Sequence, residues 1–136
     1  KQYAEKNGID AVLIKADLTR LPLKSSTFNT VLLVATLHVL QERATCLEEM
    51  KRVMKKGGEA LVTVWNKTQP RFFFSKKESY VPWKVSGKIY CRYYYLFSKR
   101  ELRKLLSEYF DLKRIFGSNE KALKLFPKNI IAVVKK

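Results

Sequence analysis

The stretch Ala16-Asp17-Leu18-Thr19-Arg20-Leu21-Pro22, together with the apolar run over residues 28–40, decides the fold of this chain. A shorter apolar segment, residues 11–14, precedes the acidic Asp17 and is predicted to be a strand covered on both faces. The longer run is rich in Val, Leu and Thr and too short for most helices, so it predicts a second buried strand over residues 30–37. Strand, polar turn and strand in this order, followed by a helical pattern, indicate an α/β fold.

The strongly basic composition points to a polyanionic partner. The net charge is +16 over 136 residues, with 28 basic and 12 acidic side chains, and nucleic acid is the first candidate partner. The alternative is that an acidic segment precedes this chain and offsets its positive charge. A hydrophobic content of 46% predicts a globular domain rather than disorder, and no apolar run is long enough for a membrane helix. Cys46 and Cys91 lack metal-like or CxxC spacing, so we expect no metal site, inert thiols and a reducing, cytoplasmic location.

The rest of the chain continues the alternation of helix and strand. Residues 42–55 carry an apolar stripe at helical spacing, and Gly57 then fits a left-handed C-terminal residue. Ser98 and Glu101 form a capping-box pattern at the start of another helix. Residues 1–6 read as the tail of a helix. The further strands are predicted at 60–65, 110–116 and 129–134.

Residues 67–97 interrupt this pattern, with weak periodicity and no helix long enough to predict. Ten aromatic residues lie here, interleaved with seven basic ones and opposed only by Glu78. Rings that stack on bases and cations that meet phosphates are what single-stranded RNA binding needs. The alternative is a lid whose rings, Phe72 to Phe74 above all, pack back onto the sheet and leave a solvated basic rim.

The chain as ordered here resembles the middle of a class I S-adenosylmethionine-dependent methyltransferase. The resemblance implies that Asp17 binds the adenine amino group of the cofactor, that the Leu18 amide contacts a ring nitrogen, and that Ala35 also lies at the cofactor. A carboxylate at the carboxyl end of a strand lies where doubly wound sheets bind ligands. The alternative is that Asp17 only caps the following amides of its own turn.

The resemblance also implies a partial domain, residues 1–136, with an insert at 67–97. The family's strand order is 3-2-1-4-5-7-6, so the sheet would lack its first two strands and the glycine-rich cofactor turn, and residues 11–14 would be the third strand, at an edge. We expect additional polypeptide, either a preceding segment or a second copy, to complete the sheet. Pairing of residues 11–14 with the strand at 30–37 would instead mean that the chain closes its own sheet. The same edge is where the family binds a small zinc-containing activator protein.

Three motifs carry a closer resemblance to the tRNA wobble-uridine carboxymethyl-ester methyltransferases. They are Val81-Pro82-Trp83, the run Arg92-Tyr93-Tyr94-Tyr95-Leu96-Phe97, and Ala35-Thr36-Leu37-His38 after the strand. Val39 and Tyr95 stand where the family has histidines, and Lys56 stands where a Pro is common. The resemblance implies catalytic roles for His38 and Arg92, with Arg92 pairing the carboxylate or phosphate of the substrate. The residues expected to bind RNA are Trp83, Lys84, Lys88, Arg92, Tyr93 and Tyr94.

Methyl transfer to a carboxylate needs no acid–base pair, because the nucleophile is already anionic at neutral pH. The leading hypothesis is therefore a methyltransferase that modifies the carboxymethyl group of wobble uridine (U34) in tRNA. His38 could instead be a satisfied structural histidine, and Arg92 a surface charge. Two other functions stay open: a class I methyltransferase for a small molecule, and a non-catalytic RNA-binding form of the fold.

Overall fold

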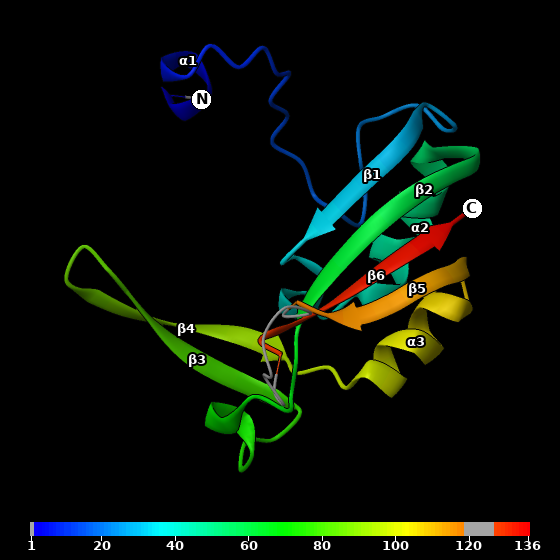
Figure 1. The fold of residues 1–136 in the computed structure, drawn as a ribbon. Helices are drawn as coiled ribbons and strands as arrows, with labels where there is room; N and C mark the ends of the chain where they lie inside the picture. Colours follow the sequence, from blue (N-terminus) through cyan, green and yellow to red (C-terminus); the bar gives the residue numbers. More distant parts are fainter. Residues whose placement is uncertain (1, 119–126) are drawn as a thin grey trace.

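A mixed four-stranded sheet forms the centre of the computed structural model, which describes residues 2–118 and 127–136 (Figure 1). The strands are β1 (Phe28–Val34), β2 (Met54–Trp65), β5 (Asp111–Gly117) and β6 (Asn129–Lys135). Their order in the sheet is β1-β2-β6-β5, with β1 parallel to β2 and β6 antiparallel to both its neighbours. This arrangement matches the 4-5-7-6 half of the expected sheet. The prediction of a partial, Rossmann-like α/β sheet is thereby confirmed.

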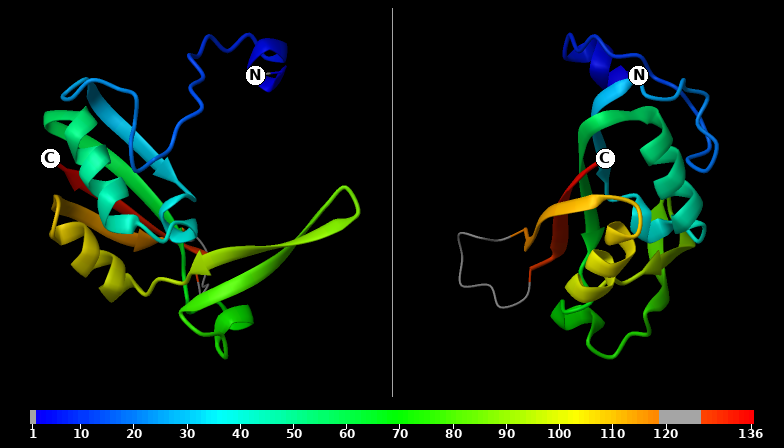
Figure 2. Two further views of the ribbon diagram at one scale, coloured as in Figure 1. Left: turned by 180° about the vertical axis from the view of Figure 1, so that it is seen from behind. Right: turned by 90° about the vertical axis from the view of Figure 1, so that its right-hand side faces the viewer.

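Two helices, α2 (Arg43–Val53) and α3 (Lys99–Ser107), cover one face of this sheet (Figure 2). Alternate residues of β1, β2 and β6 point toward them and form the core with the apolar faces of both helices. Within the described ranges no helix covers the opposite face, where Leu32 and Val34 of β1 are 67% and 55% exposed. β1 is an edge strand of this sheet.

The predicted boundaries are shifted where helix and strand meet. The helix expected at 42–55 ends at Val53, because Met54 is already extended and begins β2. Gly57 has the predicted positive φ of +77°, yet it lies in β2, where the register with β1 is irregular. Ser98 caps α3 through the expected capping box with Glu101. β2 begins six residues before the strand predicted at 60–65, whereas β1, β5 and β6 lie within three residues of their predicted bounds.

The prediction of a strand at residues 11–14 is wrong. These residues have no regular structure, and Val12, Leu13 and Ile14 are 88%, 59% and 53% exposed. They lie on a segment that runs from α1 (Gln2–Lys6) to the sheet without pairing with β1 (Figure 1). A strand needs a neighbour for its N–H and C=O groups, and the strand expected between this segment and β1 is not among the described residues.

The interrupting segment contains a hairpin that the sequence reading missed. Strands β3 (Glu78–Val85) and β4 (Lys88–Tyr95) pair antiparallel around Ser86 and Gly87, both with positive φ. The hairpin extends away from the sheet, and a short helical turn, η2 (Pro70–Phe72), precedes it (Figure 1). Phe72 is buried as expected, whereas Phe73 and Phe74 are exposed. In the part of the chain that the structure describes, no helix has the length and hydropathy to span a membrane.

Candidate functional site

A stack of aromatic rings lies where β1 and β2 reach their carboxyl ends. After β1, the turn η1 (Leu37–Val39) places His38 against Trp65, the last residue of β2, with 5.3 Å between the ring centroids. Tyr94 of β4 stacks on Trp65 at 4.2 Å and on His38 at 5.4 Å. Phe72 adds a fourth ring, 5.8 Å from Trp65. We call these four residues, from four separate elements, the aromatic cluster.

His38 is buried and neutral within this cluster. Its residue is 2% exposed, and burial lowers the pKa of its imidazole to about 4. Among the described residues, its Nδ1 is a buried polar atom with no hydrogen-bond partner. An orphaned buried nitrogen is costly unless a ligand or water meets it. His38 is therefore expected to be a neutral ring at neutral pH, with one nitrogen able to accept or donate a hydrogen bond.

Asp17 lines a cavity of about 430 Å³ beside the same edge of the sheet. Its Oδ1 accepts hydrogen bonds from the amide and the hydroxyl of Thr19, and these bonds lower the pKa of the carboxyl. The capping alternative is thus realised, yet a carboxylate has about four acceptor positions and can still receive an amino group. The other lining residues are Thr19, Val39, Leu40, Gln41, Glu42 and Tyr93.

The cavity combines an apolar wall with two exposed carboxylates, those of Asp17 and Glu42, and a wall with a carboxylate acceptor suits the adenine of a nucleoside cofactor. Val39 and Leu40 supply the wall, and the Asp17 carboxylate is a hydrogen-bond acceptor beside it. Leu18, the neighbouring predicted residue, is half-buried and packs against the core. Ala35 lies at the end of β1 in the left-handed region, with φ 52°, and its N–H is donated to Thr63. Its amide is therefore occupied, which leaves only its carbonyl for a ligand.

The polar turn that carries Asp17 is held by two charged residues of α2. Arg52 donates to the carbonyls of Leu21 and Leu23, and Glu49 accepts from the Leu21 amide at 2.8 Å. Arg52 also pairs with Glu49 at 2.7 Å, which lowers the pKa of Glu49 to about 2. Glu49 and Arg52 are three residues apart on one helix, so their pairing follows from helix spacing. Their hydrogen bonds to Leu21 and Leu23, some 28 residues earlier in the chain, do not follow from that spacing.

The hairpin register separates the residues predicted to bind RNA. Trp83, Lys88, Arg92 and Tyr94 lie on one face, whereas Lys84 and Tyr93 lie on the other. The Arg92 guanidinium lies over the Trp83 ring, 5.1 Å from its centroid. Arg92 lies two residues before Tyr94 on β4, so the two side chains are neighbours on the same face. His38 stacks on Tyr94 itself. The two residues predicted to be catalytic therefore lie on one side of the hairpin without touching.

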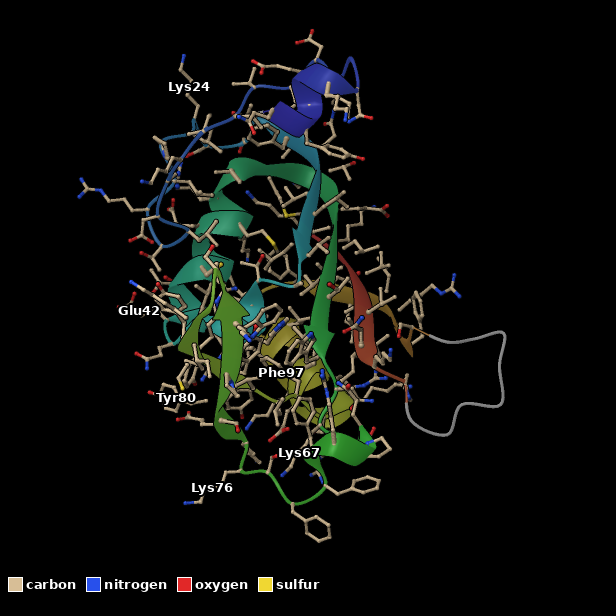
Figure 3. The ribbon with its side chains drawn as sticks, turned by 90° about the vertical axis from the view of Figure 1, so that its left-hand side faces the viewer. Lys24, Glu42, Lys67, Lys76, Tyr80 and Phe97 are labelled. Carbon is tan, nitrogen blue, oxygen red and sulfur yellow. The ribbon has the colours of Figure 1, made fainter. Side chains whose placement is uncertain are left out.

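The other face of the hairpin borders the cavity that Asp17 lines, which we call the cofactor-type cavity. Tyr93 lines that cavity, and its hydroxyl accepts a hydrogen bond from Arg43 at 3.1 Å. Arg43 also lies over the Tyr95 ring, 4.2 Å from the centroid. Glu42 and Tyr80 lie on this same side of the hairpin in Figure 3. Sequence reasoning missed Arg43, Trp65 and Phe72, whose roles depend on contacts between distant segments. Over residues 2–118 and 127–136, no group of three His, Cys, Asp or Glu residues could hold a metal ion.

Residues 1–62 match the family described as "Methyltransferase domain". Among curated proteins, the chain is 28% identical over 85 residues to "Probable tRNA methyltransferase 9B" of Homo sapiens, covering 60% of this chain and 18% of that protein. It is 30% identical over 106 residues to a putative methyltransferase of Encephalitozoon cuniculi, covering 71% of this chain and 50% of that protein. The chain thus spans half or less of these relatives' lengths.

Solved structures with the same fold match nearly the whole chain. A SAM-dependent methyltransferase from Aquifex aeolicus has a TM-score of 0.70 at 18% identity, covering 98% of this chain and 60% of that protein. The [4+2]-cyclase SpnF has a TM-score of 0.69 at 14% identity, covering 99% and 61%. At such identities the likeness shows the fold, and the cyclase illustrates that the fold alone does not fix the reaction. The chain has the class I methyltransferase-domain fold, and the family match implies S-adenosylmethionine as cofactor.

Proposed function

We propose that this chain is part of the catalytic domain of an S-adenosylmethionine-dependent tRNA methyltransferase that modifies the carboxymethyl group of wobble uridine, U34. One observation carries the proposal: β4 runs from an exposed aromatic and basic hairpin into the buried stack of Tyr94, Trp65 and His38. The cavity with Asp17 opens beside the same edge of the sheet. Similarity to proteins named as probable tRNA methyltransferases supports the substrate class.

The chain's own residues bind and orient in this reaction, and no proton has to move. When bound, S-adenosylmethionine supplies a methyl group activated by a positively charged sulfur. Asp17 would accept a hydrogen bond from the adenine amino group, and the neutral, buried ring of His38 would support the site by stacking on Trp65 and Tyr94. In-line positioning and exclusion of water supply the rate enhancement.

The test is a methyl-transfer assay with the full-length protein that contains this chain. The substrates are tRNA carrying 5-carboxymethyluridine at position 34, the same tRNA with unmodified U34, and free 5-carboxymethyluridine. We expect an alkali-labile methyl ester only on the first. An Asp17→Asn variant should raise the KM for S-adenosylmethionine, because a carboxamide can still accept a hydrogen bond but lacks the charge.

Two results would contradict the proposal. Equal methylation of the free nucleoside and of tRNA would assign the protein to the methyltransferases that act on small molecules. Unchanged activity on tRNA without the carboxymethyl group would remove the carboxylate as the acceptor.

The exposed apolar residues 11–14 remain the proposed contact for a small zinc-containing activator protein, so the assay is run with and without that protein.

A further inference from the structure

The two faces of the β3–β4 hairpin differ in charge and in what they adjoin. The face that includes Tyr94, which we call the cluster face, also carries Trp83, Tyr90, Arg92 and Lys88. It holds two cations, Arg92 and Lys88, and no acidic residue. The far face holds Lys84 and Glu78, whose charges cancel. Only the cluster face can therefore attract a polyanion by its own side chains.

The cluster face also leads into the candidate site. Side chains on one face of a strand recur about every 6.8 Å, so Tyr94, Arg92, Tyr90 and Lys88 form a regular row along β4. The row begins in the aromatic cluster, where Tyr94 is 3% exposed, and ends at the hairpin tip. Its middle is accessible, with Trp83 38% and Tyr90 52% exposed.

Ring and cation are already paired on this face. The Arg92 guanidinium lies over Trp83 at 5.1 Å from the ring centroid, and that tryptophan is still 38% exposed. On the far face the exposed ring of Tyr80 instead packs edge-on against Tyr93, with centroids 6.0 Å apart. Tyr93 is in turn bound to Arg43 of α2. The far face thus contacts helix α2 through Tyr93 and Arg43.

We propose that the cluster face is a track for a short single-stranded RNA segment. Bases stack on Trp83 and Tyr90, phosphates pair with Arg92 and Lys88, and the row delivers the target nucleotide beside the aromatic cluster. This inference rests on the proposed tRNA substrate and names the surface that holds it. It assigns Lys84 and Tyr93, expected from sequence to bind RNA, to the opposite face.

The experiment compares matched substitutions on the two faces. The 136-residue chain is titrated into a fluorescently labelled single-stranded anticodon-loop oligonucleotide, and anisotropy gives the Kd. Stacking on an aromatic side chain is worth roughly 1–3 kcal/mol per base, so Trp83→Ala and Tyr90→Ala should each weaken binding by about 5-fold to 160-fold. Tyr80→Ala removes a more exposed ring, 65% against 52% for Tyr90, from the far face and should leave Kd within about twofold.

A second comparison uses two lysines near the hairpin tip, Lys88 on the cluster face and Lys84 on the far face. Lys88→Gln should reduce the slope of log Kd against log salt by about 0.7, the value for one phosphate on a single strand. Lys84→Gln, the far-face control, should leave the slope unchanged. Duplex RNA of the same sequence should bind more weakly, since its bases are not available for stacking.

Several results would contradict the proposal that the cluster face binds single-stranded RNA. Equal losses for Tyr80→Ala and Tyr90→Ala would show that both faces, or only the folding of the hairpin, matter. Binding of heparin as tight as that of RNA would reduce the surface to unspecific charge attraction. Loss of self-association in Tyr90→Ala, measured by sedimentation, would identify the occupant as protein. Binding through the cluster face without methylation of tRNA by the full-length protein would refute only the proposed reaction.

Discussion

Burial of His38 makes the stability of this chain depend on pH. The pKa of the imidazole is about 4 in the folded state against 6.5 in the unfolded state. Below pH 6.5 the imidazole of His38 binds a proton in the unfolded chain but stays neutral in the folded chain. The free energy of unfolding therefore falls as pH drops from 6.5 toward 4. For these two pKa values the loss between pH 7.5 and 5.0 is about 2 kcal/mol. His38 is the one histidine in the sequence, which assigns this pH window to a single side chain.

Urea unfolding at several pH values between 7.5 and 5.0 measures this loss. His38→Phe keeps a ring between Trp65 and Tyr94 but cannot titrate, so its unfolding free energy should be nearly flat over the same range. It also removes the unpartnered Nδ1 and should match or exceed the wild-type stability at pH 7.5. Glu49 and Glu101, with pKa values of about 2, respond only below the range tested. A pH slope as steep in His38→Phe as in the wild type, or an NMR titration of His38 with a pKa near 6.5, would refute the reasoning.

Three further predictions concern backbone geometry and the turn that carries Asp17. Ala35→Gly should raise the free energy of unfolding by up to about 1 kcal/mol, because φ 52° strains every residue with a Cβ; a lower urea midpoint would contradict this. Arg52→Ala should speed hydrogen exchange at the Leu21 amide and lower Tm, whereas the exposed neighbour Lys51→Ala should do neither. Gly87→Val should abolish the cross-strand NOEs of the hairpin, since φ +79° excludes a β-branched residue, while Tm of the sheet stays within a few degrees.

Local patterns predicted the elements whose partners are nearby or generic. The capping box at Ser98 needs only residues three apart, and the apolar run of β1 needs only a neighbouring strand and a helix above it. Such features follow from periodicity and cap chemistry, and both elements are present in the structure. The prediction that β1 is buried is wrong, because β1 is an edge strand with Leu32 and Val34 exposed. The order of the four strands followed from the resemblance, which supplied a topology that no single pattern contains.

The features that were missed depend on contacts between distant segments. Residues 11–14 have the composition of a strand, but without a partner for their backbone they stay irregular. The hairpin carried a Ser-Gly turn signal, yet its aromatic residues do not alternate with polar ones, because both faces are used. Trp65 was read as the end of a strand. Its place in the aromatic cluster arises only when η1 and β4 approach it from 27 residues before and 29 residues after.

One short turn explains how the cofactor-type cavity and the aromatic cluster come to be neighbours. With about three residues per turn, successive side chains of a 3₁₀ turn point about 120° apart. In η1, Leu37 therefore enters the core, His38 the aromatic cluster and Val39 the wall of the Asp17 cavity. The hairpin base repeats this division, since Tyr94 joins the cluster while the preceding Tyr93 lines the cavity. A shift of η1 or of β4 by one residue would exchange these surfaces, so the register of the hairpin, more than any single charged group, keeps the aromatic cluster and the Asp17 cavity apart and adjacent.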